Sequence, residues 1–172
     1  RNHSSAASDV YKRQPPPVRV FLSHAKADGE DAMLAIRAFL EDDRSQLRTF
    51  WDARDIADGY AFARELEGPI EESESVFLAL ITDGYLLSTW CVDELAKARE
   101  AGRPVVVVRA ETSSVHRDND LLGRAPTLSW RPNDDGFWRD LLATLLEESL
   151  RFRTAREAVS YTHLTLPTNG CV

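Results

Sequence analysis

The 172-residue sequence lacks the features that mark several large classes of protein. Its two cysteines cannot build a disulfide framework, which favours a reducing compartment. Its unbroken aliphatic runs, such as residues 76–81 and 105–108, fall far short of the roughly 20 residues that cross a bilayer. No apolar stretch of the secretory type stands near its start. We therefore expect a cytoplasmic protein without a membrane partner.

Basic residues are also scarce, with 21 Lys and Arg against 28 Asp and Glu and a formal net charge of −7. Because phosphate contacts need clustered Lys and Arg, nucleic acid is not expected as a partner. At 43% hydrophobic residues the chain is neither disordered nor fibrous, and its length fits one domain with a core. Small molecules and proteins remain as partners.

Several catalytic and cofactor motifs are missing as well. No Gly-x-Gly-x-x-Gly, no Gly-x-x-x-x-Gly-Lys phosphate loop and no Gly-x-Ser-x-Gly elbow occurs in the sequence. The four histidines stand apart from any His or Cys at metal-ligand spacing. We expect no metal and no resident cofactor, and spacing alone favours a surface or capping role for His24.

The two ends differ from the middle of the chain. Residues 1–14 and 159–172 show no helical or strand period, and the second segment contains no Asp, Glu, Lys or Arg. Residues 8–14 and 161–168 resemble translated sequencing-adapter sequence, so both ends are predicted to be non-native or disordered extensions. The alternative is native flexible tails. The predicted domain comprises residues 15–158.

Short apolar runs alternate with helical patterns along this domain. Strands are predicted at residues 18–23, 47–51, 75–82, 104–109 and 127–130. Helices are predicted from Asp28, from Tyr60 with a break at Gly68-Pro69, from a Ser88 cap to about Ala101 before Gly102, and at the end to about Glu157. Residues 75–82 are apolar on both faces, which is typical of a strand covered by helices on each side. The alternation predicts an α/β, flavodoxin-like three-layer sandwich, with a five-stranded parallel sheet covered by helices on both faces.

Ligands bind such sheets at the carboxyl ends of the strands, which here are residues 21–26, 51–59 and 82–90. In the helix that follows, Trp90 and Glu94 share one face at i and i+4, whereas Cys91, Leu95 and Ala98 form an apolar stripe toward the sheet. Glu94 therefore lies at the edge of the core, beside an indole. Spacing alone also allows a surface role for Glu94 and a core-filling role for Trp90.

Three segments in register resemble the boxes of Toll/interleukin-1 receptor (TIR) domains of the bacterial, NAD-cleaving type. Residues 20–25 (VFLSHA) resemble the opening box, residues 52–59 (DARDIADG) the BB loop, and residues 88–95 (STWCVDEL) the Ser-x-Trp-Cys-x-x-Glu-Leu box of the enzymatic members. The similarity spans about residues 18–156. The order and spacing of the three boxes also fit the predicted fold.

The resemblance implies an NAD⁺ glycohydrolase or ADP-ribosyl cyclase that acts in bacterial anti-phage signalling, a branch of innate immunity. NAD⁺ would be the substrate, no cofactor would be needed, and Glu94 would be the catalytic residue. It further implies head-to-tail self-association with other TIR domains through the loop at 52–59, whose alternative is an ordinary surface loop. The substrate-binding residues that it implies are Ser23, His24, Lys26, Asp52, Asp55, Ile56, Gly59, Ser88 and Trp90.

Other functions stay open at this stage. A non-catalytic TIR adaptor or effector would act only by TIR–TIR interaction. The presence of Glu94 favours the enzyme over the adaptor. A phospho-receiver domain of the same topology could use Asp83, but Ser23 and His24 stand where it needs acids. Lys26 can equally be a plain solvated lysine. The sequence leaves the linear or cyclic nature of the product undecided.

Overall fold

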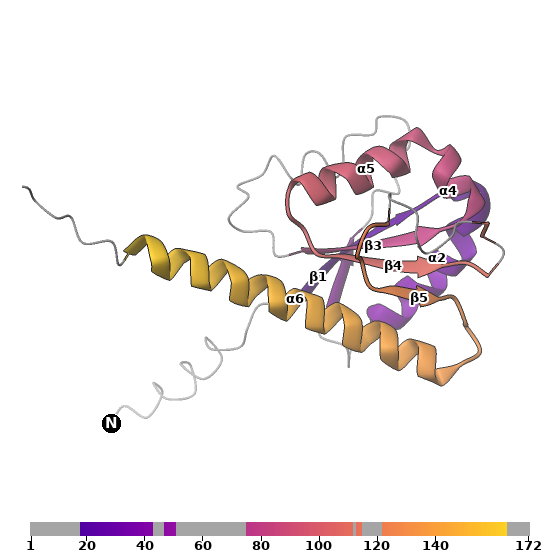
Figure 1. The fold of residues 1–172 in the computed structure, drawn as a ribbon. Helices are drawn as coiled ribbons and strands as arrows, with labels where there is room; N and C mark the ends of the chain where they lie inside the picture. Colours follow the sequence, from indigo (N-terminus) through magenta and orange to yellow (C-terminus); the bar gives the residue numbers. More distant parts are fainter. Residues whose placement is uncertain (1–17, 43–46, 51–74, 112, 115–121, 165–172) are drawn as a thin grey trace, which may run out of the picture.

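A parallel five-stranded sheet forms the centre of the molecule (Figure 1). The computed structural model describes residues 18–42, 47–50, 75–111, 113–114 and 122–164. The strands are β1 (Val18–His24), β2 (Leu47–Phe50), β3 (Ser75–Ile81), β4 (Val105–Arg109) and β5 (Thr127–Ser129), in the order β2-β1-β3-β4-β5. All four neighbouring pairs are parallel. The predicted five-stranded parallel sheet is confirmed.

β3 is the central strand, and all seven of its residues are buried. It pairs with β1 from Arg19–Ser75 to His24–Leu80 and with β4 from Phe77–Val105 to Ile81–Arg109. A strand is apolar on both faces where helices cover both faces of the sheet, and the apolar run of β3 fits this position. The register brings the carboxyl ends of β1 and β3 side by side.

Helices cover both faces of the sheet (Figure 1). On one face, α2 (Lys26–Leu40) and α6 (Asp135–Leu164) pack against Val20 and Leu22 of β1. On the other, α4 (Asp83–Leu87) and α5 (Thr89–Glu100) pack against Phe21. Since successive strand residues point to opposite faces, β1 contributes to both cores. This is the predicted three-layer arrangement.

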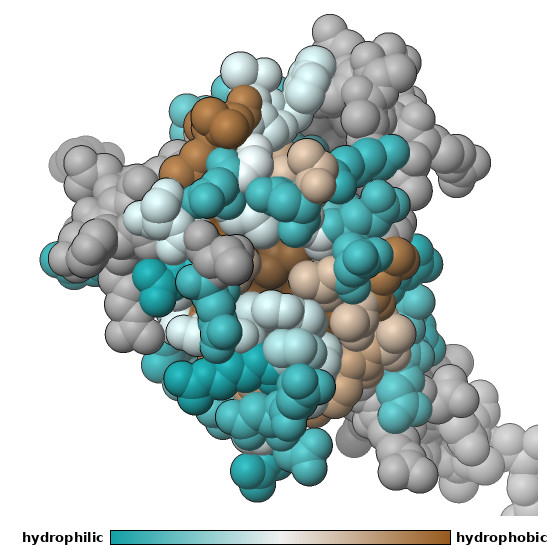
Figure 2. Space-filling model, turned by 90° about the vertical axis from the view of Figure 1, so that its right-hand side faces the viewer, coloured by the Kyte–Doolittle hydropathy of each residue, from teal (hydrophilic) through white to brown (hydrophobic). Residues whose placement is uncertain are grey.

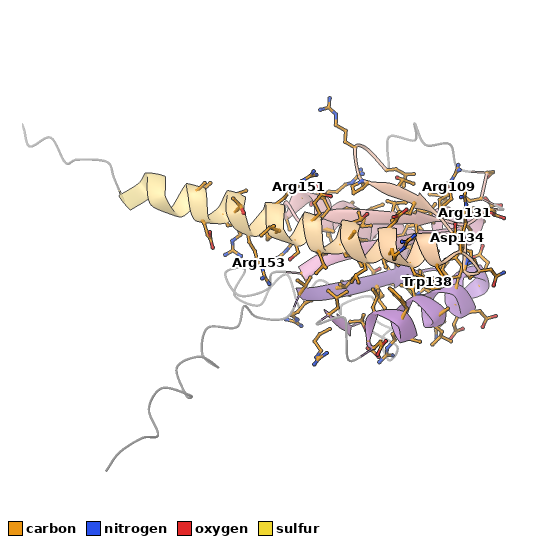
Figure 3. The ribbon with its side chains drawn as sticks, turned by 90° about the horizontal axis from the view of Figure 1, so that it is seen from below. Arg109, Arg131, Asp134, Trp138, Arg151 and Arg153 are labelled. Atoms are coloured by element: carbon orange, nitrogen blue, oxygen red, sulfur yellow. The ribbon has the colours of Figure 1, made fainter. Side chains whose placement is uncertain are left out.

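Aromatic side chains join α2 to α6 beneath the sheet. The Phe39 and Trp138 rings lie 4.8 Å apart, and Trp130 meets Phe137 edge to face at 5.3 Å. The indole N–H of Trp138 donates to the carbonyl of Pro132 at 3.0 Å, so the polar end of the ring is satisfied. In Figure 3, Trp138 lies between the two helices. This cluster stabilises the layer opposite α4 and α5.

Several element boundaries differ from the prediction. α2 begins at Lys26 rather than Asp28, and the five-residue α4 was not predicted. α6 continues to Leu164, beyond the predicted end near Glu157, so residues 159–164 are helical and not irregular. The second predicted helix, with its break at Gly68-Pro69, and the 52–59 loop lie outside the described residues.

α5 was predicted correctly at both ends. The Ser88 hydroxyl caps its first turn, and Gly102 follows its end with a φ of 65°, a left-handed conformation that glycine adopts without strain. No helix within the described ranges combines the length and the apolar character that a membrane span requires.

Candidate functional site

The carboxyl ends of β1 and β3 mark the point at which the sheet order reverses. From β1 the chain goes outward to β2, whereas β3 lies on the other side of β1. In open α/β sheets such a point forms the usual ligand-binding crevice. Figure 2 views this edge of the molecule, where hydrophilic side chains surround a recess that exposes hydrophobic atoms.

Glu94 reaches this edge from α5. Its Oε2 atom accepts a hydrogen bond of 2.8 Å from Oγ of Ser23, the second-last residue of β1. The Ser23 side chain is only 2% exposed, so the carboxylate is fixed against a rigid strand rather than a loop. Glu94 itself is half-buried. It is therefore not an ordinary solvated surface residue of the helix.

Tyr85 lies behind Ser23 and is fully buried. Its hydroxyl is 3.0 Å from the Ser23 hydroxyl and donates to the carbonyl of Cys91 at 3.1 Å. Burial raises the pKa of Tyr85 well above its usual value near 10, so the phenol stays protonated. Sequence reasoning did not select Tyr85. One sequence signal could have found it: Thr-Asp-Gly directly after the central strand is typical of a helix N-cap and would have placed Tyr85 in the first turn of a helix.

Asp28 of α2 holds α4 in place. Its carboxylate accepts from the Thr82 hydroxyl at 2.6 Å and from the backbone N–H of Gly84 at 2.8 Å. The same Thr82 hydroxyl accepts from the N–H of Tyr85 at 3.1 Å as the N-cap of α4. A Cβ atom on Gly84 would come within 2.6 Å of the Asp28 carboxylate. The close approach of α2 and α4 therefore depends on this glycine.

A family model described as "TIR domain" matches residues 20–148 of the chain. The chain belongs to the TIR-domain family. It is also similar to the solved structure of the TIR domain of the Toll-related receptor TRR-2 from the lower metazoan Hydra magnipapillata. The two are 21% identical with a TM-score of 0.53, and the match covers 76% of this chain and 98% of that one. That level of similarity supports the fold alone. No curated protein matches the chain.

Trp90 of this TIR domain is 48% exposed. It stands one turn before Glu94 on α5 and contributes little to the core, so the core-filling interpretation is wrong. Cys91, by contrast, lies on the buried stripe with Leu95 and Ala98, as predicted. Its thiol donates to the His24 carbonyl at 3.4 Å, and burial raises the pKa of Cys91. The cysteine therefore stays a thiol at neutral pH.

The other predicted substrate contacts are distributed around the same edge. His24 ends β1 and is half-buried, and burial lowers its pKa below the usual 6.5. Lys26 is exposed at the first position of α2. Ser23 and Ser88 are engaged inside the protein, in the contact with Glu94 and in the α5 cap. Their contact with substrate stays a prediction.

The remaining predicted contacts, Asp52, Asp55, Ile56 and Gly59, lie outside the described residues. Asp83, which a receiver domain would use, accepts instead from the backbone N–H and the hydroxyl of Ser114, each at 2.9 Å. These bonds lower the pKa of Asp83. Across the part of the chain that the structure describes, no three His, Cys, Asp or Glu side chains are grouped so as to hold a metal ion.

Proposed function

We propose that this TIR domain breaks the bond between nicotinamide and ribose in NAD⁺, with Glu94 as the catalytic residue. The observation that carries the proposal is the Glu94 carboxylate, which a 2.8 Å bond from buried Ser23 fixes at the carboxyl end of β1. A carboxylate fixed in advance at a ligand-binding edge can stabilise positive charge without reorganising. The products would be nicotinamide and ADP-ribose or a cyclic isomer, and the resemblance to bacterial members implies anti-phage signalling as the setting.

The chemistry requires few groups. When the C–N bond breaks, its electron pair goes to the pyridinium ring, and nicotinamide leaves as a neutral molecule without a proton donor. The ribose carbon becomes oxocarbenium-like, as in glycoside hydrolysis. Water then adds to it and releases a proton, or a nitrogen of the adenine closes a ring. One carboxylate suffices to bind the ribose hydroxyls and to offset the developing positive charge.

The neighbouring side chains fit supporting roles. Trp90 offers an exposed indole one turn before Glu94, on which a flat ring can stack. Lys26 is exposed at the start of α2 and can approach the phosphates as a cation. His24 is held neutral at neutral pH by the burial that lowers its pKa, so it would contribute hydrogen bonding and not charge.

The test is to incubate the purified protein with NAD⁺ and to resolve the products by chromatography. We expect nicotinamide together with an equal amount of ADP-ribose or a cyclic isomer. A Glu94→Gln protein purified in the same way is the blank for contaminating hydrolases. Equal nicotinamide release by the two preparations would refute the assignment of Glu94.

A second candidate function is non-catalytic association with other TIR domains. The observation that favours it is Leu87, whose side chain is 85% exposed at the end of α4, close in the chain to the exposed Trp90. Exposed aromatic side chains such as Trp90 are enriched at protein interfaces. To test this candidate separately from NAD⁺ cleavage, we would compare the self-association of the wild-type and Leu87→Ala proteins by sedimentation. A weaker association of Leu87→Ala would support it, and equal association would count against it.

A further inference from the structure

Ser23 and Tyr85 form a short chain of hydrogen bonds that ends on Glu94. Three contacts link its members: Glu94 Oε2 to Ser23 Oγ at 2.8 Å, Ser23 Oγ to the Tyr85 hydroxyl at 3.0 Å, and the Tyr85 hydroxyl to the Cys91 carbonyl at 3.1 Å. The two hydroxyls bring one proton each, and a carbonyl can only accept. The number of contacts that carry a proton therefore depends on the protonation state of Glu94.

With Glu94 ionised, two protons serve three contacts. Ser23 must donate to the carboxylate, which is an acceptor only, so Tyr85 chooses between Ser23 Oγ and the Cys91 carbonyl. With Glu94 protonated, all three contacts are satisfied in one direction, from Glu94 to Ser23, from Ser23 to Tyr85 and from Tyr85 to the carbonyl. The series of hydrogen bonds is therefore complete when Glu94 is a carboxylic acid. When Glu94 is a carboxylate, one of the three contacts lacks a proton.

Tyr85 is well placed for this task because both of its ends are held. At its backbone, Thr82 accepts from its N–H, and Asp28 ties Thr82 and Gly84 to α2. At its hydroxyl, it is bonded to the carbonyl of Cys91, one turn before Glu94 on the same helix. Tyr85 therefore fixes the Ser23 hydroxyl and α5 relative to each other.

From this geometry we infer that Tyr85 is a positioning residue that acts on Glu94 through Ser23 and favours the protonated form of its carboxyl group. The inference rests on the proposed function only in its consequence for turnover. Its effect on the ionisation of Glu94 can be measured in the absence of any reaction.

Other titratable groups surround the chain of hydrogen bonds. They are His24 of β1, then Lys26, Asp28 and Glu30 of α2, and Cys91 of α5. Burial raises the pKa of both Tyr85 and Cys91, so neither titrates along with a carboxyl group. Burial lowers the pKa of His24, which calls for a control variant in any titration below neutral pH.

Two substitutions shift the Glu94 midpoint in opposite directions if the inference holds. Tyr85→Phe removes two contacts from the protonated arrangement and one from the ionised arrangement, so the midpoint of Glu94 falls. Ser23→Ala removes the donor to the carboxylate, and because hydrogen bonds to a charge are about twice as strong as neutral ones, the midpoint rises. A role confined to packing would move both midpoints in the same direction or in neither.

The experiment is a carboxyl ¹³C NMR titration of the full chain, with the Glu94 signal identified by its absence in Glu94→Gln. Wild type, Tyr85→Phe and Ser23→Ala are compared, with Ser149→Ala as a control that removes a buried hydroxyl from α6. His24→Gln in each background separates the effect of the imidazole. Melting curves report whether each variant folds. If Tyr85→Phe does not fold, the ring ¹³Cζ signal of Tyr85 in the wild type decides: it should titrate at the Glu94 midpoint, because its hydroxyl accepts from Ser23 only when Glu94 is protonated, and a constant signal would overturn the inference.

In the NAD⁺ assay we expect Tyr85→Phe to lower kcat roughly tenfold with KM little changed, since one network contact supports the reacting geometry. The acid limb of its pH profile should move to lower pH with the Glu94 midpoint. Unchanged midpoints in folded Tyr85→Phe and Ser23→Ala would overturn the inference even if NAD⁺ is cleaved. Opposite midpoint shifts without any cleavage would overturn the proposed function and leave the inference standing.

Discussion

Gly84 is the residue on which the spacing between α2 and α4 depends most directly. Alanine normally favours a helix over glycine by about 1 kcal/mol. Here its Cβ would lie 2.6 Å from Oδ1 of Asp28, whose carboxylate accepts from Thr82 and from the backbone of Gly84. The carboxylate can yield only by giving up these two bonds, each of which stabilises the fold by about 1 kcal/mol.

We therefore predict that Gly84→Ala lowers the free energy of unfolding by about 1–2 kcal/mol in urea titrations. The control is a double-mutant cycle with Asp28→Ala, in which the cost of the alanine should shrink or change sign because the crowded carboxylate is gone. An equal cost in both backgrounds would show that the clash does not involve Asp28.

His24 should make stability depend on pH. Burial lowers its pKa in the folded state, whereas the unfolded chain binds a proton near pH 6.5. As the pH falls through 6.5, the unfolded state gains the proton first, so stability decreases until the folded-state pKa is passed. We predict that His24→Gln flattens the decrease in Tm between about pH 7 and pH 5. If the Tm of His24→Gln decreased as steeply as that of the wild type, a group other than His24 would cause the pH dependence.

At the scale of elements, α5 connects the stability of the fold with the site. Its buried stripe of Cys91, Leu95 and Ala98 packs on the sheet, while Trp90 and Glu94 stand on the neighbouring face. The Ser88 hydroxyl caps its first turn. Because core contacts and candidate site residues occupy different faces, substitutions on α5 should separate stability from activity.

Trp90→Ala is the clearest case. The indole is 48% exposed and belongs to neither hydrophobic core, so we predict that its loss lowers activity more than Tm, with at least about a tenfold loss in kcat/KM for NAD⁺. Trp90→Phe should recover part of the activity. Leu150→Ala, at an exposed apolar residue of α6 that has no role in the candidate site, is the control for general surface effects on turnover. Parallel losses of Tm and activity in Trp90→Ala would indicate a structural role instead.

The sequence predicted a helix or strand well where all of its signals lie within one short segment. The five strands and α5 follow from apolar runs, a serine cap and a terminal glycine, all of which are short-range signals. α4 escaped prediction because five residues contain too little periodicity. α6 exceeded its predicted end because residues 159–164 continue the helix without the charged pattern that marks the earlier turns.

The site was predictable only in part for a related reason. Glu94 was found because Trp90 and Cys91 lie near it in the sequence. The partners of Glu94 come from other elements, with Ser23 separated from it by 71 residues and from Tyr85 by 62. Only the order of strands in the sheet brings such distant residues together. Sequence spacing could therefore name the carboxylate but not the hydrogen bonds that hold it.

At the scale of the whole molecule, the 30-residue α6 is longer than the sheet that it crosses, and its far end projects beyond the other layers (Figure 1). Near the middle of α6, Arg151 pairs with Glu147 and Glu148 on the helix surface. Exposed pairs of this kind contribute little to stability. The core on this face of the sheet lies between the first half of α6, α2 and the strands, and the other core lies under α4 and α5.

Self-association is a further property of the whole molecule. TIR domains interact with one another, and the resemblance implies head-to-tail contacts that help to complete the substrate site. We predict that the specific activity rises with protein concentration or with a crowding agent, because mass action populates the associated form. Constant specific activity over a wide concentration range, with a monomeric sedimentation profile during turnover, would contradict this.

The most direct measurement of the central claim is the rate of nicotinamide release from NAD⁺ by wild type, Glu94→Gln and Glu100→Gln at equal concentration. Glu100 lies on the same helix and is exposed, so it controls for the loss of one carboxylate from α5. We predict that Glu94→Gln loses at least about a hundredfold in rate while its melting curve matches wild type, because the amide keeps the shape but not the charge. Glu100→Gln should retain the wild-type rate. Near-normal turnover by folded Glu94→Gln would contradict the account.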